Sequence, residues 1–151
     1  MRFLGIDYGT KKIGLSVSDE KGMLAFPNGI VLNDKNIFKS IENILKKEDI
    51  TDIVIGESND KGGQPNSVGG DIDLFAKELE KRFGIVVYKQ KEFFTSVEAR
   101  RDVSVGKKVN STSYNKKKKE KNKKVDDIAS ALILQRFLDQ RSRQEGGINK
   151  I

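Results

Sequence analysis

The sequence contains no cysteine, no histidine and no tryptophan, and only 2 of its 151 residues are proline. Without cysteine or histidine the chain has no disulfide frame, no ordinary structural zinc site and no Ser/His or Cys/His nucleophile pair. Any catalysis must therefore come from carboxylates, lysines, hydroxyls or a bound metal ion.

Long apolar runs are also missing. No stretch approaches the roughly 18 consecutive apolar residues that a membrane span requires, and Asp7 interrupts the first apolar segment, unlike the apolar part of a secretory signal. We therefore expect a cytoplasmic protein with no membrane partner. The length fits one domain, which at this size buries roughly two-thirds of the surface of its unfolded chain.

Positive charge is concentrated in one segment. The chain has 29 Lys and Arg against 22 Asp and Glu, a net charge of +7. Residues 115–124 read NKKKKEKNKK, so seven lysines and one glutamate supply six of the excess charges; the first four lysines are Lys116, Lys117, Lys118 and Lys119. This segment favours nucleic-acid contact, where such charges add salt-sensitive affinity. The alternatives are a solvated loop or the lysine bias of a low-GC genome.

Alternating patterns dominate the first part of the chain. Residues 2–7 and 13–18 are rich in apolar and small residues and flank a short polar turn, which predicts an antiparallel hairpin. Residues 23–26 are compatible with a third strand, which we expect to stop at the Pro-Asn-Gly of residues 27–29.

Helical and buried-strand patterns alternate after this point. Amphipathic spacing predicts helices over about residues 37–48 and 72–83, the second closed by Gly84. Short β-branched runs predict buried parallel strands at residues 52–56 and 85–88. A capping box at residues 95–98 predicts a short helix, and a final helix should run over residues 125–138.

The order of these elements, βββαβαβα, predicts an α/β fold. Three antiparallel strands should be followed by two parallel ones in a mixed sheet flanked by helices. We expect a single domain over residues 1–139, with a lysine-rich loop at residues 104–124 and a flexible tail at residues 140–151.

Acidic residues follow three of the predicted strands. Asp7, Glu57 and Glu92 each come at or just after a strand end, where sheets of this kind place their functional sites. Carboxylates gathered without bases favour a hard divalent cation, so we expect Mg²⁺ or Mn²⁺. For each acid taken alone, a helix cap or a solvated loop residue is an equal alternative.

Residues 4–19, LGIDYGTKKIGLSVSD, closely resemble the first hairpin of the YqgF family, also called RuvX. The resemblance continues through Phe75-Ala76, residues 82–84, Glu92 with residues 95–99, and residues 124–135, and thus covers residues 1 to about 139. The family is described both as Holliday junction resolvases and as pre-16S ribosomal RNA nucleases. The resemblance implies an RNase H-like fold and a metal-dependent nuclease site made of Asp7, Glu92 and Asp126.

Two departures from the family pattern surround this site. Lys91-Glu92-Phe93 stands where the family usually has Asp-Glu-Arg, and Gly56-Glu57-Ser58 stands where it usually has Gly-Leu-Pro. RuvC-like resolvases, which share the broader fold, take a catalytic glutamate from the end of that strand. We therefore hypothesise that Glu57 joins or replaces Glu92 as a metal ligand.

The resemblance also implies a mechanism. Two metal ions roughly 4 Å apart, bridged by Asp7, would activate a water molecule and stabilise the leaving 3′ oxygen of a phosphodiester. Gly9 and Thr10 would allow a close approach to the phosphate, while Lys11 and Lys12 neutralise neighbouring phosphates.

The expected function is nuclease action in processing of the 5′ end of pre-16S rRNA. The alternatives are a resolvase acting on branched DNA and a non-catalytic RNA-binding module in ribosome assembly. Two symmetric cuts in a junction require a dimer, and no long unpaired apolar helix face demands one here. We therefore favour a monomer acting on structured RNA, with a dimer and branched DNA as the second possibility. The hairpin also resembles that of actin-like ATPases, but those need two such domains.

Overall fold

The computed structural model of the chain describes residues 1–58, 67–92 and 111–148, and within them it leaves undescribed the side chains at positions 58, 67–69, 92, 111–127 and 147–148. The predicted capping-box helix at residues 95–98 lies outside the described residues. The elements are β1 (Phe3–Asp7), β2 (Lys12–Ser18), β3 (Ala25–Leu32), α1 (Ile37–Lys47), β4 (Asp52–Ser58), α2 (Ser67–Phe83), β5 (Val86–Glu92) and α4 (Ser111–Ile148).

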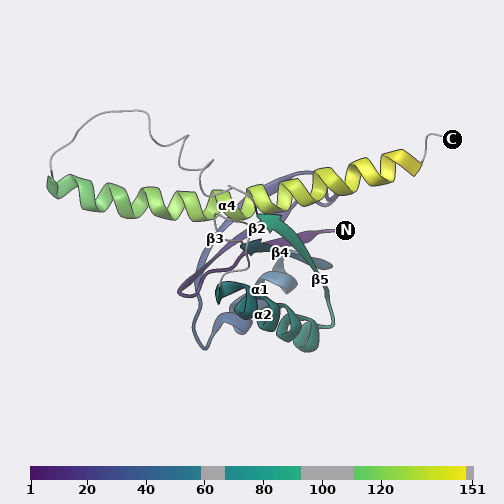
Figure 1. The fold of residues 1–151 in the computed structure, drawn as a ribbon, viewed down its shortest axis with the longest axis horizontal. Coiled ribbons are helices and arrows are strands. Elements are labelled where there is room, and N and C mark those ends of the chain that lie inside the picture. The colour runs from purple at the N-terminus through teal and green to yellow at the C-terminus, as the bar shows by residue number, and fades with distance from the viewer. Residues whose placement is uncertain (59–66, 93–110, 149–151) are drawn as a thin grey trace.

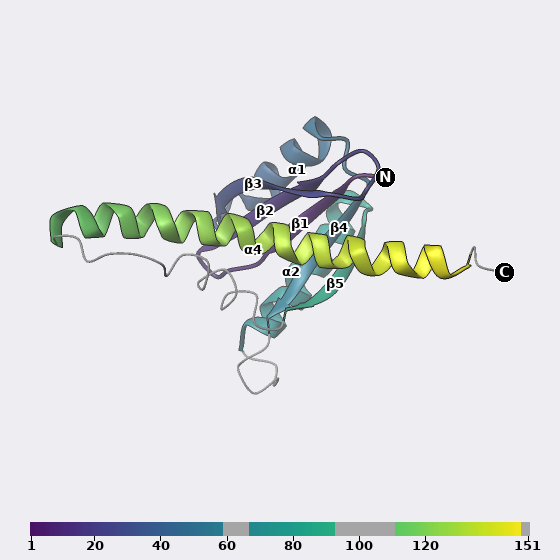
Figure 2. The ribbon, with the colours of Figure 1, turned by 90° about the horizontal axis from the view of Figure 1, so that it is seen from above.

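The five strands form one mixed sheet in the order β3-β2-β1-β4-β5. The pairs β1–β2 and β2–β3 are antiparallel, whereas β1–β4 and β4–β5 are parallel. Figures 1 and 2 show α1 and α2 against one face of this sheet and α4 crossing the other face obliquely. The predicted α/β class and the predicted strand arrangement are confirmed.

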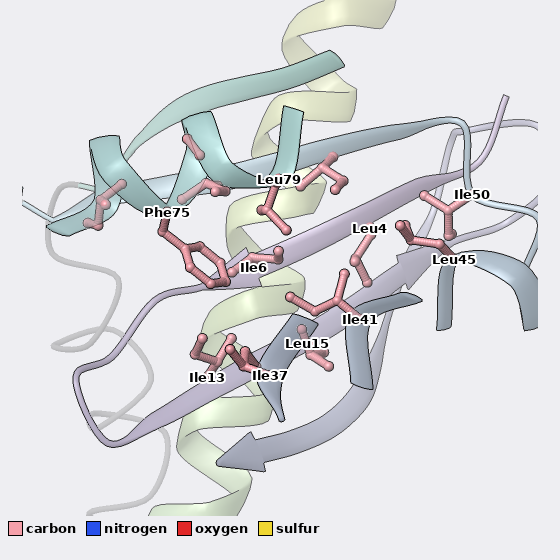
Figure 3. Close-up of a cluster of buried hydrophobic side chains, with 14 residues drawn as sticks. Leu4, Ile6, Ile13, Leu15, Ile37, Ile41, Leu45, Ile50, Phe75 and Leu79 are labelled. Carbon is pink, nitrogen blue, oxygen red and sulfur yellow. The ribbon is translucent and has the colours of Figure 1, made fainter. Parts of the chain in front are cut away.

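Strand alternation divides the core into two layers. Leu4 and Ile6 of β1 and Ile55 of β4 face α1 and α2, where they pack with residues such as Ile41 and Leu79 (Figure 3). The intervening positions face α4 instead, and there the buried cluster consists of Phe3, Val54, Ile133, Leu134 and Leu138. Because successive strand residues point to opposite faces, these two clusters fix the face on which each residue at a strand end lies.

The third strand is longer than predicted. We expected it to stop before residues 27–29, but β3 continues through Pro27 to Leu32. Pro27 is tolerated because β3 is an edge strand, whose outer side needs no ladder hydrogen bonds. The β2–β3 register also shifts between Gly14 and Ser16, opposite a stretch where Gly29 has φ of 88°. A bulge of this kind absorbs the turn-forming residues without ending the strand.

The last helix corrects two predictions. Residues 111–124 of the predicted loop are helical, and so is the predicted flexible tail as far as Ile148. Residues 111–145 include no proline or glycine, are rich in Lys and also contain Arg, Gln and Leu, all of which have high helix propensity. Apolar periodicity marked only the part of this helix that packs on the sheet, which explains the short prediction. Among the described helices, none is long and apolar enough to cross a membrane.

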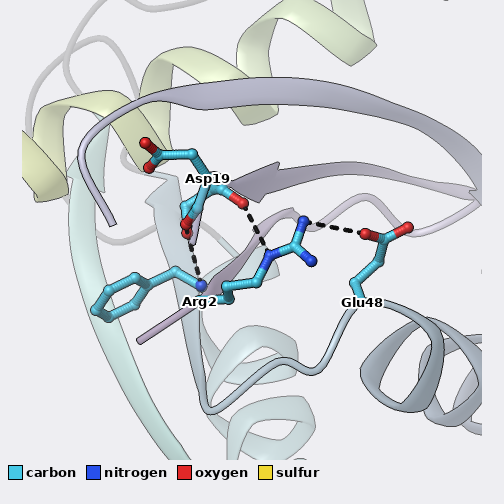
Figure 4. A network of polar contacts seen from close by, with 5 residues as sticks. Arg2, Asp19 and Glu48 are labelled. Atoms are coloured by element: carbon cyan, nitrogen blue, oxygen red, sulfur yellow. Dashed lines mark hydrogen bonds and ion pairs between the residues drawn. The ribbon is translucent and has the colours of Figure 1, made fainter. Parts of the chain in front are cut away.

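Polar contacts hold the amino end of β1. The Arg2 guanidinium donates to the Ser18 carbonyl at 3.3 Å and to Glu48 Oε2 at 3.1 Å, which ties β1 to β2 and to the residue after α1 (Figure 4). On the α4 side, Arg141 donates to Met1 Sδ at 3.3 Å and lies over the Phe3 ring. This end of the sheet is therefore structural, and the opposite end carries the carboxyl termini of β1, β4 and β5.

Candidate nuclease site

Asp7 is the last residue of β1, the central strand, and pairs with Gly14 of β2. It is half-buried. It lies two residues after Gly5, and an added Cβ at Gly5 would point at Ser16 and Leu134. Gly5 and Asp7 share a strand face, so Asp7 belongs to the face covered by α4.

The ends of β4 and β5 lie side by side, with Glu57 opposite Lys91 and Ser58 opposite Glu92. Position 92 follows Tyr88 and Gln90 on the same face, and Tyr88 packs against Phe137 of α4 at 5.0 Å between ring centroids. Alternation therefore places position 92 on the face of Asp7. The side chain of Glu92 is not among those described.

Glu57 lies on the other face. It follows Ile53 and Ile55, which both pack in the cluster under α1 and α2. Its charge helps to raise the pKa of Lys89, although the main cause is the hydrogen bond from Lys89 to Asp73 of α2. The structure thus brings the backbone positions of Asp7 and Glu92 to one face of the sheet and separates Glu57 from them.

Helix α4 carries position 126 towards Asp7. Ser130, one turn after position 126, donates from its Oγ to the Gly5 carbonyl at 3.0 Å. Arg141, further along α4, contacts Met1 and Phe3, so the helix runs opposite to β1. Four helical residues rise about 6 Å and two strand residues about 6.6 Å, so position 126 lies near the level of Asp7.

The loop between β1 and β2 presents the predicted phosphate-binding residues. Thr10, Lys11 and Lys12 are exposed. Gly9 is required for close packing, because an added Cβ would lie 2.3 Å from the Lys12 carbonyl oxygen. A side chain larger than glycine would force the loop open.

Asn33 holds this loop in place, a role that the sequence pattern missed. Its Nδ2 donates to the Gly9 carbonyl and its backbone N–H donates to the Lys11 carbonyl, both at 2.9 Å. Asn33 is not the cap of α1, because the residue directly before that helix is Asn36. No local signal could have found this contact, because it joins residues 24 positions apart.

A cleft of about 350 Å³ lies on the opposite side of the sheet from Asp7. Its lining residues are Tyr8, Phe38, Asp71, Leu74, Phe75 and Glu78. Tyr8 and Phe75 pack with their centroids 5.1 Å apart, within the α1 and α2 layer. This cleft is therefore separate from the face that Asp7 and position 92 share.

The donor chemistry fits a hard divalent cation. Among the described residues no three acidic side chains are close enough to hold a metal ion, and the side chains of Glu92 and Asp126 are not part of that set. The predicted ligands are all carboxylates in a chain without histidine or cysteine. Oxygen donors of this kind suit Mg²⁺ or Mn²⁺.

The chain is similar to known proteins over most of its length. The family model described as RuvX: Holliday junction resolvase matches residues 1–140. A protein of Anaplasma marginale named "Putative pre-16S rRNA nuclease" is 34% identical over 140 residues, covering 91% of this chain and 84% of its own. A protein of the same name from a Sulfurihydrogenibium species is 33% identical over 143 residues, covering 93% and 92%.

Solved structures show the fold. Thermus thermophilus RuvC superposes with a TM-score of 0.53 at 14% identity, covering 94% of this chain and 96% of its own. The fowlpox virus resolvase, in a complex with Holliday junction DNA, has a TM-score of 0.53 at 18% identity, covering 93% and 98%. The fold is therefore RNase H-like, as in these resolvases. Because the family match extends over nearly the whole length, the chain belongs to the RuvX family of Holliday junction resolvases, a family of nucleases.

Proposed function

We propose that this chain is a cytoplasmic, metal-dependent nuclease that hydrolyses phosphodiester bonds in processing the 5′ end of pre-16S rRNA. Asp7, Glu92 and Asp126 are the proposed catalytic and metal-binding residues. Glu57 leaves this set, because strand alternation puts it on the α1 and α2 face.

One observation carries the proposal. β1 and β5 end at the same edge of a parallel sheet segment, and α4 docks on β1 so that position 126 falls near the level of Asp7. The backbone positions of three acids from distant parts of the sequence therefore lie toward one end of the α4 face, which supports the proposal. Carboxylates that lie close together repel one another unless a bound cation or a proton neutralises part of their charge.

The proposed mechanism assigns separate roles to the carboxylates, the β1–β2 loop and the lysines. The carboxylates of Asp7, Glu92 and Asp126 would hold a divalent cation, which would supply an activated water and charge neutralisation at the phosphate. The loop held by Asn33 offers its backbone and the Thr10 hydroxyl to a phosphate. Lys11 and Lys12, together with the lysines at positions 116–119 of α4, supply positive charge for the nucleic-acid backbone.

Structured RNA is the preferred substrate class. The relatives that share about a third of their residues with this chain are named for pre-16S rRNA, whereas the two solved resolvases described above are 14% and 18% identical to it. A monomer suffices to trim an RNA strand. The second candidate is resolution of branched DNA, supported by the family description and requiring a dimer.

The test is cleavage of a labelled precursor RNA and of a synthetic four-way junction with Mg²⁺ or Mn²⁺. We expect metal-dependent cutting of the RNA that EDTA abolishes and that falls at least about 100-fold in Asp7→Asn. Glu20→Gln, an exposed acid at the opposite end of the sheet, is the matched control and should cut normally. Binding of RNA with no cleavage would identify a non-catalytic binding module instead.

A further inference from the structure

Two buried serines join α4 to the middle of the sheet. Ser16 of β2 and Ser130 of α4 both have 0% exposure. The Ser130 hydroxyl donates to the Gly5 carbonyl at 3.0 Å. The Ser16 Oγ lies 3.0 Å from the Ser130 carbonyl oxygen and 2.9 Å from the Ser130 Oγ, so it donates to Ser130.

Gly5 makes this contact possible. A Cβ added there would lie 2.2 Å from Ser16 Oγ and 2.9 Å from Leu134 Cβ. At Gly5 the helix therefore approaches the backbone of β1 closely, because no β1 side chain stands between them. At such a short separation, hydrogen bonds can join the helix to the strand backbone itself.

Hydrogen bonds define the orientation of a helix on a sheet more strictly than apolar packing does. Apolar side chains resist separation of α4 from the sheet, but they define its rotation and axial position less strictly than hydrogen bonds with fixed geometry. Among the described hydrogen bonds between α4 and the sheet, those of Ser130 are nearest in sequence to Asp126. Those of Gln135, with Ala25 and Met23, lie a further turn away.

We propose that Ser16, Ser130 and the Gly5 carbonyl form a positioning contact that sets Asp126 relative to Asp7. Ser130 connects the surroundings of the two acids. It lies one helical turn from Asp126, and its acceptor, the Gly5 carbonyl, lies two residues from Asp7. Ser16 and Ser130 are positioning residues, since neither is proposed to touch metal or substrate. The importance of this contact for catalysis rests on the proposed nuclease function, but the contact itself can be tested without it.

The chain contains a matched control. Ser18 is in the same strand as Ser16, on the same face, and also has 0% exposure. Its Oγ accepts a hydrogen bond from the Phe3 N–H and donates to the Asp19 carbonyl, both at 2.9 Å, at the opposite end of β1 from Asp7. Ser18→Ala therefore removes a comparable buried hydroxyl without affecting the position of Asp126.

The first measurement uses the absence of native cysteine. In Asp7→Cys/Asp126→Cys, dibromobimane joins thiols that lie close together and becomes fluorescent, so its rate reports the separation of these positions in the full chain. We expect Ser16→Ala or Ser130→Ala on this background to lower the cross-linking rate about fivefold, and Ser18→Ala to leave it unchanged. An unchanged rate in both test variants would overturn the proposal. If Ser130→Ala does not fold, Ser16→Ala carries the test, because it keeps the Ser130 bond to Gly5.

The second measurement is Mn²⁺ affinity by electron paramagnetic resonance in the cysteine-free protein. We expect the Mn²⁺ Kd to rise about tenfold in Ser16→Ala and Ser130→Ala but not in Ser18→Ala. A lowered cross-linking rate without any Asp7-dependent Mn²⁺ binding would uphold the positioning contact and reject the metal site. Asp7-dependent Mn²⁺ binding with an unchanged cross-linking rate would uphold the metal site and reject the positioning contact.

Discussion

One step along a strand decides whether an acid can join the site. Glu57 and Ser58 are neighbours in β4, yet alternation sends them to opposite faces of the sheet. Glu57 contributes to the environment of Lys89 and α2, whereas Ser58 pairs with Glu92 at the α4 face. The presence of an acid at a strand end is therefore insufficient evidence for a shared site, since the acid must also point to the right face of the sheet.

The placement of Glu57 and Glu92 on opposite faces of the sheet yields a prediction for their glutamine variants. We expect Glu92→Gln to lower metal-dependent cleavage at least about 100-fold, since it removes a proposed ligand. Glu57→Gln should lower it less than about threefold, because position 57 faces away from Asp7. Both are measured as initial cleavage rates of the same labelled RNA at saturating Mg²⁺. A loss in Glu57→Gln as large as that in Glu92→Gln would restore Glu57 as a ligand.

At the scale of elements, the packing of α4 on β1 depends on a missing side chain. Gly5 lies where helix and strand approach closely, and the helix contributes Leu134 and the Ser130 carbonyl to that contact. Asn33 performs an analogous role for the hairpin loop, where backbone and side chain together hold Gly9 and Lys11. Both contacts position the proposed site without belonging to it.

We predict that Gly5→Ala destabilises the fold by about 3 kcal/mol, because the new methyl group overlaps Ser16 and Leu134 in a fully packed layer. The measurement is urea unfolding followed by circular dichroism. The matched control is Gly70→Ala, within α2, where an added Cβ meets nothing within 4 Å. This control should raise stability by about 0.5–1 kcal/mol, since alanine is the better helix former. Equal effects of the two substitutions would contradict the close approach.

At the scale of the whole molecule, α4 is much longer than the sheet that it crosses. Its two ends project beyond the strands on either side (Figures 1 and 2). The lysine-rich segment 115–124 falls in the first half of this helix, ahead of Asp126. The helix thus connects most of the excess positive charge to the proposed site in one continuous element.

We predict that replacing Lys116, Lys117, Lys118 and Lys119 by Gln lowers the slope of log binding constant against log salt concentration by up to about 3 units. Each phosphate contact contributes about 0.7 to that slope on single-stranded nucleic acid. Fluorescence anisotropy with a labelled RNA over a salt series measures it. The control replaces four exposed lysines of equal total charge, Lys21, Lys47, Lys77 and Lys81. An equal fall in both variants would mean that only net charge matters.

The sequence alone was sufficient for the fold class and for the first hairpin. Apolar alternation, amphipathic spacing and the glycine at position 84 are local signals. They marked β1, β2, α1 and the end of α2 close to their observed bounds, whereas α2 starts at Ser67, five residues before the predicted start. Local signals were less informative for β3, where an edge position tolerates Pro27, and for α4, where helix propensity extends beyond the buried stripe. The family resemblance named Asp7, Glu92 and Asp126, and their roles stay a prediction.

Only the tertiary structure decided which of these residues face one another. The side of the sheet occupied by Glu57 and position 92 depends on strand register, and the level of position 126 depends on a hydrogen bond between residues 125 positions apart. The role of Asn33 likewise depends on a contact across 24 positions. Such information is absent from local patterns, because periodicity defines the faces of each element but not how separate elements are placed against one another.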